Sequence, residues 1–443
     1  MKKVYYQLKM IQKSPLRVGN GDAEVTDSDL MLDGRGFPFI PGSSIAGVLR
    51  EQYGKVLSAS KKDVDMLFGY IDGEILKDSR LIVSDAVVSE DCTKDDFMIS
   101  IRDGIGLDEW GSTISGHKYD FQVVETKKAY TAILEWSGEE AAYLTEIKNG
   151  LDILMQAVSA EGLLLGARTT RGYGSMAVEV KRKEFVFSEE GNGEEVVFPD
   201  VIDKWLAFDP FDKDAFAEAD LVAAGAGDRK NMTIHLDLTM KGSFSVRVNT
   251  ARAERLKEDG SIPDSLPLRN QDKNPVIPGT SWAGTFRHHI LDLLRQSGIE
   301  PIYGKEAEAL NLLFGKSQEE GKHIRSEIRF KETAITGGAA YSITRNAVER
   351  FTQAPRNTAL YTNRLWQGGK GELEITVTES KMTKLQRQLL AIALIDMDLG
   401  LMTVGGEAGV GRGRCMITRL TVNGQDKTAE LKACNSHFLE GKA

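Results

Sequence analysis

Cysteine and histidine are scarce in this sequence, which has three cysteines and six histidines in 443 residues. Cys92, Cys415 and Cys434 lie far apart and form no CxxC pair, so neither a disulfide framework nor a structural zinc site is expected. No apolar run approaches the roughly 20 residues that a membrane-spanning helix needs. The first ten residues, MKKVYYQLKM, lack the apolar core of a secretory signal. We therefore expect a cytoplasmic protein with no membrane partner.

The chain has no net positive charge, and its formal charge is −9. A negative net charge argues against binding to nucleic acid. The acidity is uneven, however. Residues 184–228 hold 13 acidic and two basic residues, a net of −11, and subtracting this from −9 leaves +2 for the remainder. The Gly, Pro and acidic content of this segment is typical of a linker with at most one short helix, either solvated or docking a basic partner. Average charge therefore does not exclude RNA.

The sequence does contain an internal repeat. Three landmarks recur in the same order: PGSSIAGVLR at Pro41 and PGTSWAGTFR at Pro278, LFG at Leu67 and Leu313, and LGARTTRGYGS at Leu165 and VGGEAGVGRGR at Val404. Their offsets are 237, 246 and 239 residues, and the first pair is identical at six of ten positions. This regularity predicts a tandem duplication, with domains at 1–183 and 231–443 joined by an acidic linker at 184–230.

Both copies show the same succession of elements. A strand is expected at 4–10 and at 232–240, followed by a Gly- and Asp-rich loop and a helix after the Pro-Gly pair. The hydroxyl oxygens of Ser43, Ser44, Thr280 and Ser281 are expected to cap these helices. Leucine and isoleucine at helical spacing over 144–158 and 385–395 predict a second helix, and strands at 175–180 and 414–422 close the copies.

Between these elements, each copy has a long polar stretch that begins at Arg102 or Arg345 and ends in aromatic, strand-like sequence. Such a stretch would suit a projecting hairpin, although an ordinary surface insertion is the alternative. The order of strands and helices favours an α+β, ferredoxin-like unit in each copy over a doubly wound parallel sheet.

The glycine-rich loops are the strongest candidates for binding an anion, because glycine lets backbone N–H groups approach a ligand closely. Arg168, Arg171 and Tyr173 flank the first loop, and Arg412 and Arg414 flank the second. Guanidinium groups bind phosphate through paired donors, and a tyrosine ring can stack on a base. The loops are neither a P-loop nor a Rossmann fingerprint, because no Gly-Lys-Ser/Thr follows and each lies between a helix and a strand.

Taken together, the IPGSS-x-x-G-x-L-R string after a Gly/Asp loop, the LFG, the Arg-led stretch and the terminal Arg/Gly loop resemble the CRISPR-associated RAMP superfamily. Each half is similar to a backbone subunit of type III CRISPR effector complexes, so the chain resembles a tandem, double backbone subunit. The resemblance implies two RNA-recognition-motif-like domains with thumb hairpins, which bind CRISPR guide RNA, pair it with complementary target RNA and assemble with other type III effector subunits.

The resemblance also implies that an aspartate in the loop before the Pro-Gly helix cleaves the target RNA. Asp27 and Asp264 each lie 14 residues before the proline and precede a serine, which favours them over the neighbouring aspartates. A carboxylate there would hold a divalent cation, Mg²⁺ or Mn²⁺, beside the phosphate. The residues expected to contact RNA are Ser43, Ser44, Arg50, Arg102, Arg168, Arg171, Gly172, Tyr173 and Gly174 in the first copy and Ser281, Arg287, Arg345, Gly411, Arg412, Gly413 and Arg414 in the second.

The sequence departs from the family pattern in two places, and other readings stay open. Ala46 and Ala283 replace a helix lysine that family members commonly have, and Glu407 replaces the Arg168 of the first loop. One alternative is a structural guide-RNA-binding subunit without catalysis. Others are a guide-processing RAMP endoribonuclease, which often uses a histidine, and a protein scaffold that binds no RNA. His288 and His289 have no counterpart in the first copy and are interpreted as packing or surface residues.

Overall fold

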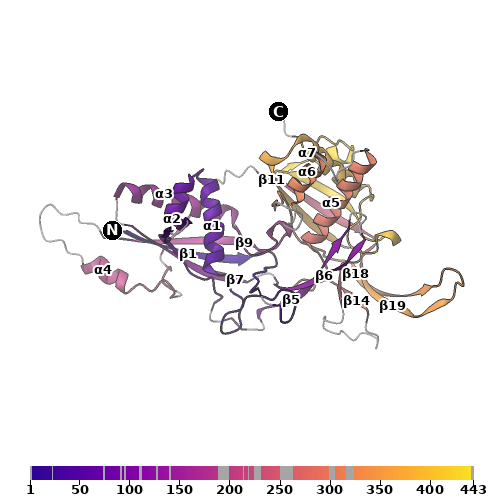
Figure 1. Cartoon of the computed structure of the whole chain (residues 1–443), viewed down its shortest axis with the longest axis horizontal. Helices are drawn as coiled ribbons and strands as arrows, with labels where there is room; N and C mark the ends of the chain where they lie inside the picture. Colours follow the sequence, from indigo (N-terminus) through magenta and orange to yellow (C-terminus); the bar gives the residue numbers. More distant parts are fainter. Residues whose placement is uncertain are drawn as a thin grey trace. The chain divides into compact units, whose positions relative to one another are not determined.

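The chain forms two compact units in a computed structural model (Figure 1). The first comprises Met1–Ile99, Val123–Thr169 and Gly174–Arg229, and the second comprises Ser100–Gln122, Thr170–Tyr173 and Lys230–Ala443. Two pieces of the first sequence copy thus belong to the second compact unit. The structure describes residues 2–21, 23–72, 75–89, 92–93, 96–108, 112–125, 128–138, 141–187, 199–212, 214–217, 219–223, 231–249, 263–298, 305–315 and 324–440.

The first unit is built on an antiparallel sheet with the order β9–β1–β7–β4. Its strands are β1 (Lys2–Gln12), β4 (Leu81–Val83), β7 (Ala129–Gly138) and β9 (Ser175–Val186). Numbered along the chain, these strands lie in the order 4-1-3-2. With one helix after the first strand and one after the third, this arrangement is ferredoxin-like, as predicted.

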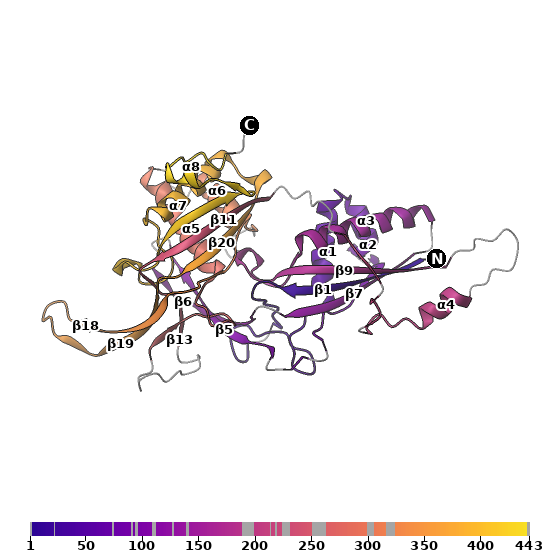
Figure 2. The same ribbon diagram turned by 180° about the vertical axis from the view of Figure 1, so that it is seen from behind.

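Three helices lie together on one face of this sheet, as the two opposite views show (Figures 1 and 2). They are α1 (Gly42–Val56), α2 (Lys61–Phe68) and α3 (Ala141–Glu161). Alternate β1 residues from Val4 to Met10 point into the core beneath them, so period-2 hydrophobicity sets which face is buried. The shorter elements are β2 (Tyr70–Asp72), β3 (Ile75–Lys77), β8 (Leu163–Leu164), η2 (Thr169–Arg171), α4 (Pro199–Leu206) and β10 (Asp220–Leu221).

The opposite face of the first sheet is covered by part of the acidic segment. Its described residues, 199–212, 214–217 and 219–223, contain α4 and β10, and β10 pairs with β9. Phe216 is 1% exposed and packs in a cluster with Tyr5, Ile133 and Phe185 of the sheet. The Trp205 indole N–H donates to the Tyr5 hydroxyl at 3.0 Å. The described part of the acidic segment therefore packs on the first unit.

The second unit repeats the ferredoxin-like arrangement. Its sheet has the order β16–β20–β11–β21–β22, which is again 4-1-3-2 with one added edge strand. The sheet strands are β11 (Asn231–Lys241), β16 (Ile328–Phe330), β20 (Lys370–Thr378), β21 (Arg414–Val422) and β22 (Gln425–Asp426). The helices are α5 (Gly279–Gln296), α6 (Lys305–Phe314), α7 (Lys384–Asp398) and α8 (Thr428–Lys432). Trp282, Phe286 and Phe330 lie in the core that the helices and sheet share.

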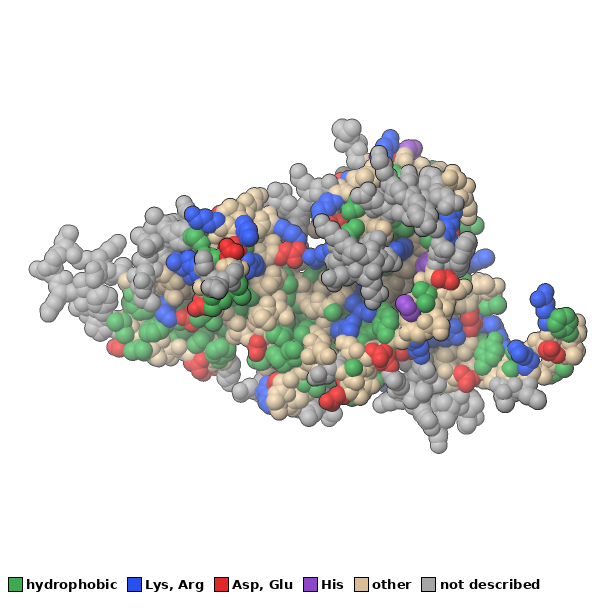
Figure 3. Space-filling model, viewed as in Figure 1, with side chains coloured by type: hydrophobic (Ala, Val, Ile, Leu, Met, Phe, Trp, Pro, Cys, Tyr) green, Lys and Arg blue, Asp and Glu red, His purple; other side chains and the backbone are tan. Residues whose placement is uncertain are grey.

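Both predicted hairpins are present. The first is β5 (Ile99–Leu107) paired with β6 (Thr113–Val124), and the second is β18 (Ala339–Val348) paired with β19 (Pro355–Gln367). The β18–β19 hairpin extends away from the body of its unit as a long arm (Figures 1 and 2), with Lys and Arg side chains along it (Figure 3). The remaining short elements of the second unit are β12 (Ser243–Phe244), β13 (Arg247–Asn249), β14 (Ser265–Pro267), β15 (Val276–Ile277), β17 (Thr333–Ala334), η4 (Glu379–Lys381) and η5 (Ala408–Val410).

In the described part of the chain, every helix is too short or too polar to cross a lipid bilayer.

Candidate nucleic-acid interface

The two glycine-rich loops share one backbone conformation. Gly174 and Gly413 have φ values of 71° and 77°, and a Cβ placed on either would lie about 2 Å from a carbonyl oxygen, 1.8 Å from Leu165 O and 2.0 Å from Val404 O. Both positions therefore require glycine. The glycines therefore form tight turns. Their contact with RNA stays a prediction.

A second shared feature is a left-handed residue that is not glycine. Arg168 has φ 60° and Glu407 has φ 63°, at matching positions of the two loops. This conformation is uncommon for residues with a side chain and costs about 1 kcal/mol or more, so both loops hold it against local preference. The two loops thus share a backbone conformation at this position, although the side chains there have opposite charges.

The first loop continues into packing within the second unit. The Arg171 guanidinium donates to Phe314 O at 3.2 Å, and a Cβ at Gly172 would lie 2.4 Å from Phe330 O. Gly172 is buried, whereas its counterpart Gly411 is exposed with open space around it. The tip of the first loop is thus packed against protein, and the tip of the second is open.

Besides the buried glycines Gly172, Gly174 and Gly413, three large side chains that are predicted to contact RNA are buried in this structure. Arg102 is 2% exposed, forms an ion pair with Glu332 and lies over the ring of Tyr173, itself 2% exposed. Arg412 is 4% exposed. Burying a guanidinium requires a paired charge, and Arg102 and Arg412 each have one. In this structure these three side chains contact protein. Their contact with RNA stays a prediction.

The helix caps are corrected. Helices α1 and α5 have Pro41 and Pro278 at the N-cap position and no side-chain cap, so Ser43, Ser44 and Ser281 lie inside the first turn. In α1 the first amide, that of Gly42, donates to Asp85 Oδ1 at 2.7 Å, and a residue far away in sequence thus satisfies it. Ser43 is exposed, and Ser44 and Ser281 are half-buried.

The matched helix arginines are both partly buried. Arg50 forms an ion pair with Asp65 and donates to Gly69 O at 3.1 Å, which ties α1 to the end of α2. Arg287 is half-buried on α5, and Arg414 is exposed at the start of β21. Of these predicted RNA contacts, Arg414 has the most accessible side chain.

The aspartates of the first loop have different roles. Asp29 accepts hydrogen bonds from the N–H groups of Glu24, Val25 and Thr26 at 2.8 to 2.9 Å and from the Thr26 hydroxyl at 2.7 Å. These bonds, the one from the Val25 N–H foremost, lower the pKa of Asp29 to about 2. Asp29 is buried, whereas Asp27 is exposed. Asp29 therefore holds the loop together and Asp27 faces solvent.

Asp33 has a second structural role in this loop. Its Oδ1 accepts from the N–H of Phe37 at 2.9 Å, and in the second copy Asn270 Oδ1 accepts from the Asn274 N–H at 3.0 Å. Both bonds span four residues and lie 237 positions apart in sequence. The same turn thus recurs in the two loops in the register that the Pro-Gly landmark predicts.

Backbone pairing places Asp27 and Asp264 at matching positions. Gly19 bridges Leu30 in the first loop, and Arg247 pairs with Pro267 in the second. Asp27 and Asp264 each precede the second member of these pairs by three residues. Asp264 is exposed as well. The matched register is therefore present in the fold and not only in the aligned letters.

Asp264 is additionally joined to the base of the second hairpin. Its Oδ2 accepts from the Thr362 N–H at 2.6 Å, and its own N–H donates to Thr362 O at 2.7 Å. The neighbouring Ser265 hydroxyl donates to Asn363 Oδ1 at 2.9 Å. These bonds fix where the Asp264 carboxylate lies relative to β19.

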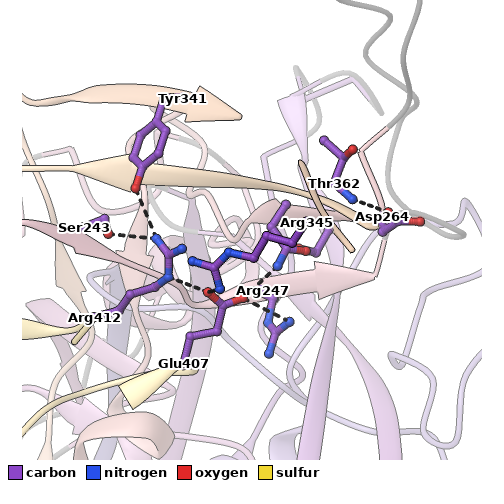
Figure 4. A network of polar contacts seen from close by, with 10 residues as sticks. Ser243, Arg247, Asp264, Tyr341, Arg345, Thr362, Glu407 and Arg412 are labelled. Atoms are coloured by element: carbon purple, nitrogen blue, oxygen red, sulfur yellow. Dashed lines mark hydrogen bonds and ion pairs between the residues drawn. The ribbon is translucent and has the colours of Figure 1, made fainter. Parts of the chain in front are cut away.

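Beside Asp264 lies a network centred on Glu407 (Figure 4). Arg247 Nη1 is 3.9 Å and Arg345 Nη1 is 3.6 Å from the Glu407 carboxylate, and Arg412 forms an ion pair with it. The Asn363 amide donates to Glu407 Oε1 at 2.7 Å. Three guanidinium groups and one amide therefore surround the carboxylate of Glu407.

The buried member of this network, Arg412, is held by two neutral hydroxyl groups. Arg412 Nη1 donates to the Ser243 hydroxyl at 2.9 Å and to the Tyr341 hydroxyl at 3.1 Å (Figure 4). Arg247 and Arg345 are the outer members, with side chains 46% and 28% exposed. The buried Arg412 thus anchors a group whose other two guanidinium ions reach solvent.

Several members of this network were not among the predicted site residues. Arg247, Ser243, Tyr341 and Asn363 come from three different segments, and none belongs to a repeated motif. Glu407 was noted only as a departure from the first loop. Its charge, set among arginines in the sequence VGGEAGVGRGR, was the one signal that could have indicated an ion-pair network.

The described residues contain no group of three or more His, Cys, Asp or Glu side chains that could hold a metal ion. A single carboxylate at Asp27 or Asp264 fits a divalent cation that takes its other ligands from water and phosphate oxygens, as magnesium commonly does.

Comparison with protein families identifies the family of the chain. No curated protein matches the chain at a significant level. The profile of the RAMP superfamily matches residues 12–177 and 220–416, which together make up about four fifths of the sequence. The two matched regions correspond to the two ferredoxin-like units of the fold. Membership indicates a CRISPR-associated role in binding RNA. The chain belongs to the RAMP superfamily, with two RAMP regions in tandem.

Proposed function

We propose that the chain is a double backbone subunit of a cytoplasmic type III CRISPR effector complex. In this proposal it binds CRISPR guide RNA and cleaves complementary target RNA once per copy, at Asp27 and Asp264. The observation that supports it best is the matched position of two exposed aspartates, each of which lies three residues before a corresponding backbone pair and before the Pro-Gly helix.

The neighbouring carboxylates strengthen the choice. Asp29 and Asp33 accept hydrogen bonds from backbone N–H groups of their own turn, so their oxygens are engaged in holding the loop. Asp27 lies in the loop that they hold, and it is exposed. A reactive group needs such a support, because a catalytic side chain works only when its position is fixed by others.

In the cleavage step, the protein's part would be placement. Asp264, held by the Thr362 N–H, would present its carboxylate to the RNA backbone at the base of the second hairpin. Arg247 and Arg345 would bind a neighbouring phosphate through charge-assisted hydrogen bonds. A divalent cation bound with the RNA would supply stabilisation of charge on the phosphate oxygens.

The histidines offer little support for the guide-processing alternative. His289 Nε2 lies 2.7 Å from Asp396 and joins α5 to α7, and burial lowers the pKa of the half-buried His288. Both are on a helix that packs in the core of the second unit, and this agrees with the packing role expected of them.

The proposal is tested by target cleavage in the assembled complex with magnesium or manganese. Asp27→Asn and Asp264→Asn should each remove a separate set of products, by roughly 100-fold or more, while guide binding stays within about twofold. Glu24→Gln, an exposed carboxylate of the same loop, serves as the matched control and should cleave as wild type does. If wild type binds target and neither aspartate variant changes the products, the chain is a structural RNA-binding subunit instead.

A further inference from the structure

The arrangement around Glu407 has the composition of a phosphate-binding site with a carboxylate already in it. Arg247, Arg345 and Arg412 bring three positive charges to one negative charge, a formal net of +2. Guanidinium groups bind phosphate and carboxylate oxygens by the same paired N–H geometry. A group with this excess of positive charge still attracts a further anion.

Comparison of the two loops separates the shape of this site from its charge. Glu407 and Arg168 have nearly the same left-handed φ, 63° and 60°, at matching positions. Because an arginine adopts this backbone in the first loop, the second loop does not require an acidic residue for its shape. The carboxylate of Glu407 therefore acts through its charge and its hydrogen bonds.

The contacts of Glu407 divide into an inner and an outer set. Arg412 is 4% exposed and Asn363 is 3% exposed, so the bonds to these two residues lie inside the protein. Arg247 and Arg345 are partly exposed, and their nitrogens lie 3.9 and 3.6 Å from the carboxylate, longer than a good hydrogen bond. An anion from solvent can reach the outer pair without breaking the inner one.

We propose that Glu407 is an internal counter-ion that stands in for an RNA phosphate in the second copy. A phosphodiester takes over Arg247 and Arg345, while Arg412 and Asn363 keep the carboxylate in place. This inference rests on the proposed RNA-binding function and adds a control of affinity: the second copy binds RNA only to the extent that phosphate competes with its own carboxylate. The first copy, with Arg168 at the same position, has no such competitor there.

The experiment measures binding of single-stranded oligouridine to the full chain by fluorescence anisotropy at several salt concentrations. Glu407→Gln keeps the side-chain shape and the hydrogen bond from Asn363 but removes the competing charge. Glu407→Gly also removes it, and glycine fits the left-handed backbone without strain. Both variants should bind about fivefold more tightly at low salt, and the slope of log K against log salt should steepen by about 0.7 for each further phosphate that the released arginines neutralise.

Arg247→Ala is the matched variant from the outer pair. It should weaken binding and make the salt slope shallower by about 0.7. In the double variant with Glu407→Gln, part of the increase in affinity should disappear, because one of the two released arginines is missing.

The outcomes separate this inference from the proposal beneath it. If wild type binds RNA and Arg247→Ala weakens it, but neither Glu407 variant tightens it, the counter-ion role is wrong and RNA binding stands. If both Glu407 variants lose their cooperative thermal unfolding, Glu407 is a structural support and the inference also fails. If no protein binds RNA at any salt concentration, the proposed function is wrong and the inference falls with it.

Discussion

The outer faces of the two ferredoxin-like sheets carry different side chains on the same strand order. In the first sheet Tyr5 and Ile133 face outward and are covered by the aromatic residues of the acidic segment. The residues in the matching strand positions of the second sheet are Thr233 and Glu374, both polar. The two copies thus share the strand order and pairing of the sheet but differ in the side chains on its outer face.

The matched arginines of the two hairpin stretches show the same divergence. Arg102 is buried in an ion pair with Glu332, whereas Arg345 is partly exposed and faces the carboxylate of Glu407. One serves packing and the other is available to a ligand. An aligned residue in a duplicated protein therefore shares a place in the fold and not necessarily a function.

The largest expected effect concerns the covered outer face. Phe216→Ala should lower the free energy of unfolding of the first unit by about 4 kcal/mol, because a fully buried aromatic ring leaves a cavity. Phe211→Ala, in the same segment but 68% exposed, should change it by less than about 0.5 kcal/mol. Chemical denaturation followed by tryptophan fluorescence measures both. Equal effects of the two substitutions would show that the segment does not pack on the sheet.

The comparison of arginines is sharpened by replacing each with methionine, which keeps most of the volume. Arg102→Met should cost about 3 kcal/mol, since it leaves the Glu332 carboxylate partly buried without its partner. Arg345→Met should cost less than about 1 kcal/mol, because Glu407 keeps two other arginines.

The order of the two effects should be reversed when the affinity for RNA is measured. Arg345→Met should weaken oligouridine binding, while Arg102→Met should leave the affinity of the folded protein near that of wild type. Thermal unfolding and anisotropy on the same preparations provide the two readouts. A loss of affinity for Arg102→Met without a loss of stability would contradict its structural role.

The smallest expected effect is a loss of stability at low pH in the loop before α1 and not in the loop before α5. The folded pKa of Asp29 is lowered to about 2, below the ordinary value near 4, so its stabilisation is complete above pH 4 and is lost as the pH falls toward 2. The corresponding residue in the second copy is Leu266, and Asn270 replaces Asp33. The protection of backbone amides against hydrogen exchange, relative to an unstructured peptide at the same pH, should therefore fall in residues 24–37 below pH 4 and change little in residues 264–275. Asp29→Asn should remove most of the pH dependence, and an equal response of both loops would contradict this account.

Much of this fold could be predicted from the sequence because its determinants are local or periodic. Alternating apolar residues predicted the central strands, and helical spacing predicted α3 and α7. The repeated glycines predicted the two loops, where a positive φ and a close carbonyl oxygen leave no room for a side chain. The register of Asp27 and Asp264 could be read from the Pro-Gly landmark, since the same turns connect them in both copies.

What the sequence did not predict depends on contacts between distant segments. The burial of Arg102 follows from Glu332, 230 residues away, and the capping of Gly42 follows from Asp85. The network on Glu407 assembles residues from strands β12 and β13, from the β18–β19 hairpin and from the second glycine-rich loop, and none of them stands out in its own segment. Charge composition likewise gave no sign that an acidic segment would pack its aromatic rings on a sheet.

The strand order has a consequence for how the protein is made. β1 leaves the ribosome first, but both strands that flank it, β7 and β9, begin at residues 129 and 175, and the cover over its outer face ends at β10. Because chain synthesis takes about a tenth of a second per residue, the earliest strand waits many seconds for its neighbours. The β5–β6 hairpin waits longer still, since Ser100–Gln122 belongs to the unit completed last. A nascent chain that ends before residue 230 lacks Glu332, so Arg102 would have no ion-pair partner and would be exposed. Such a chain would be recognised in the cell as incompletely folded.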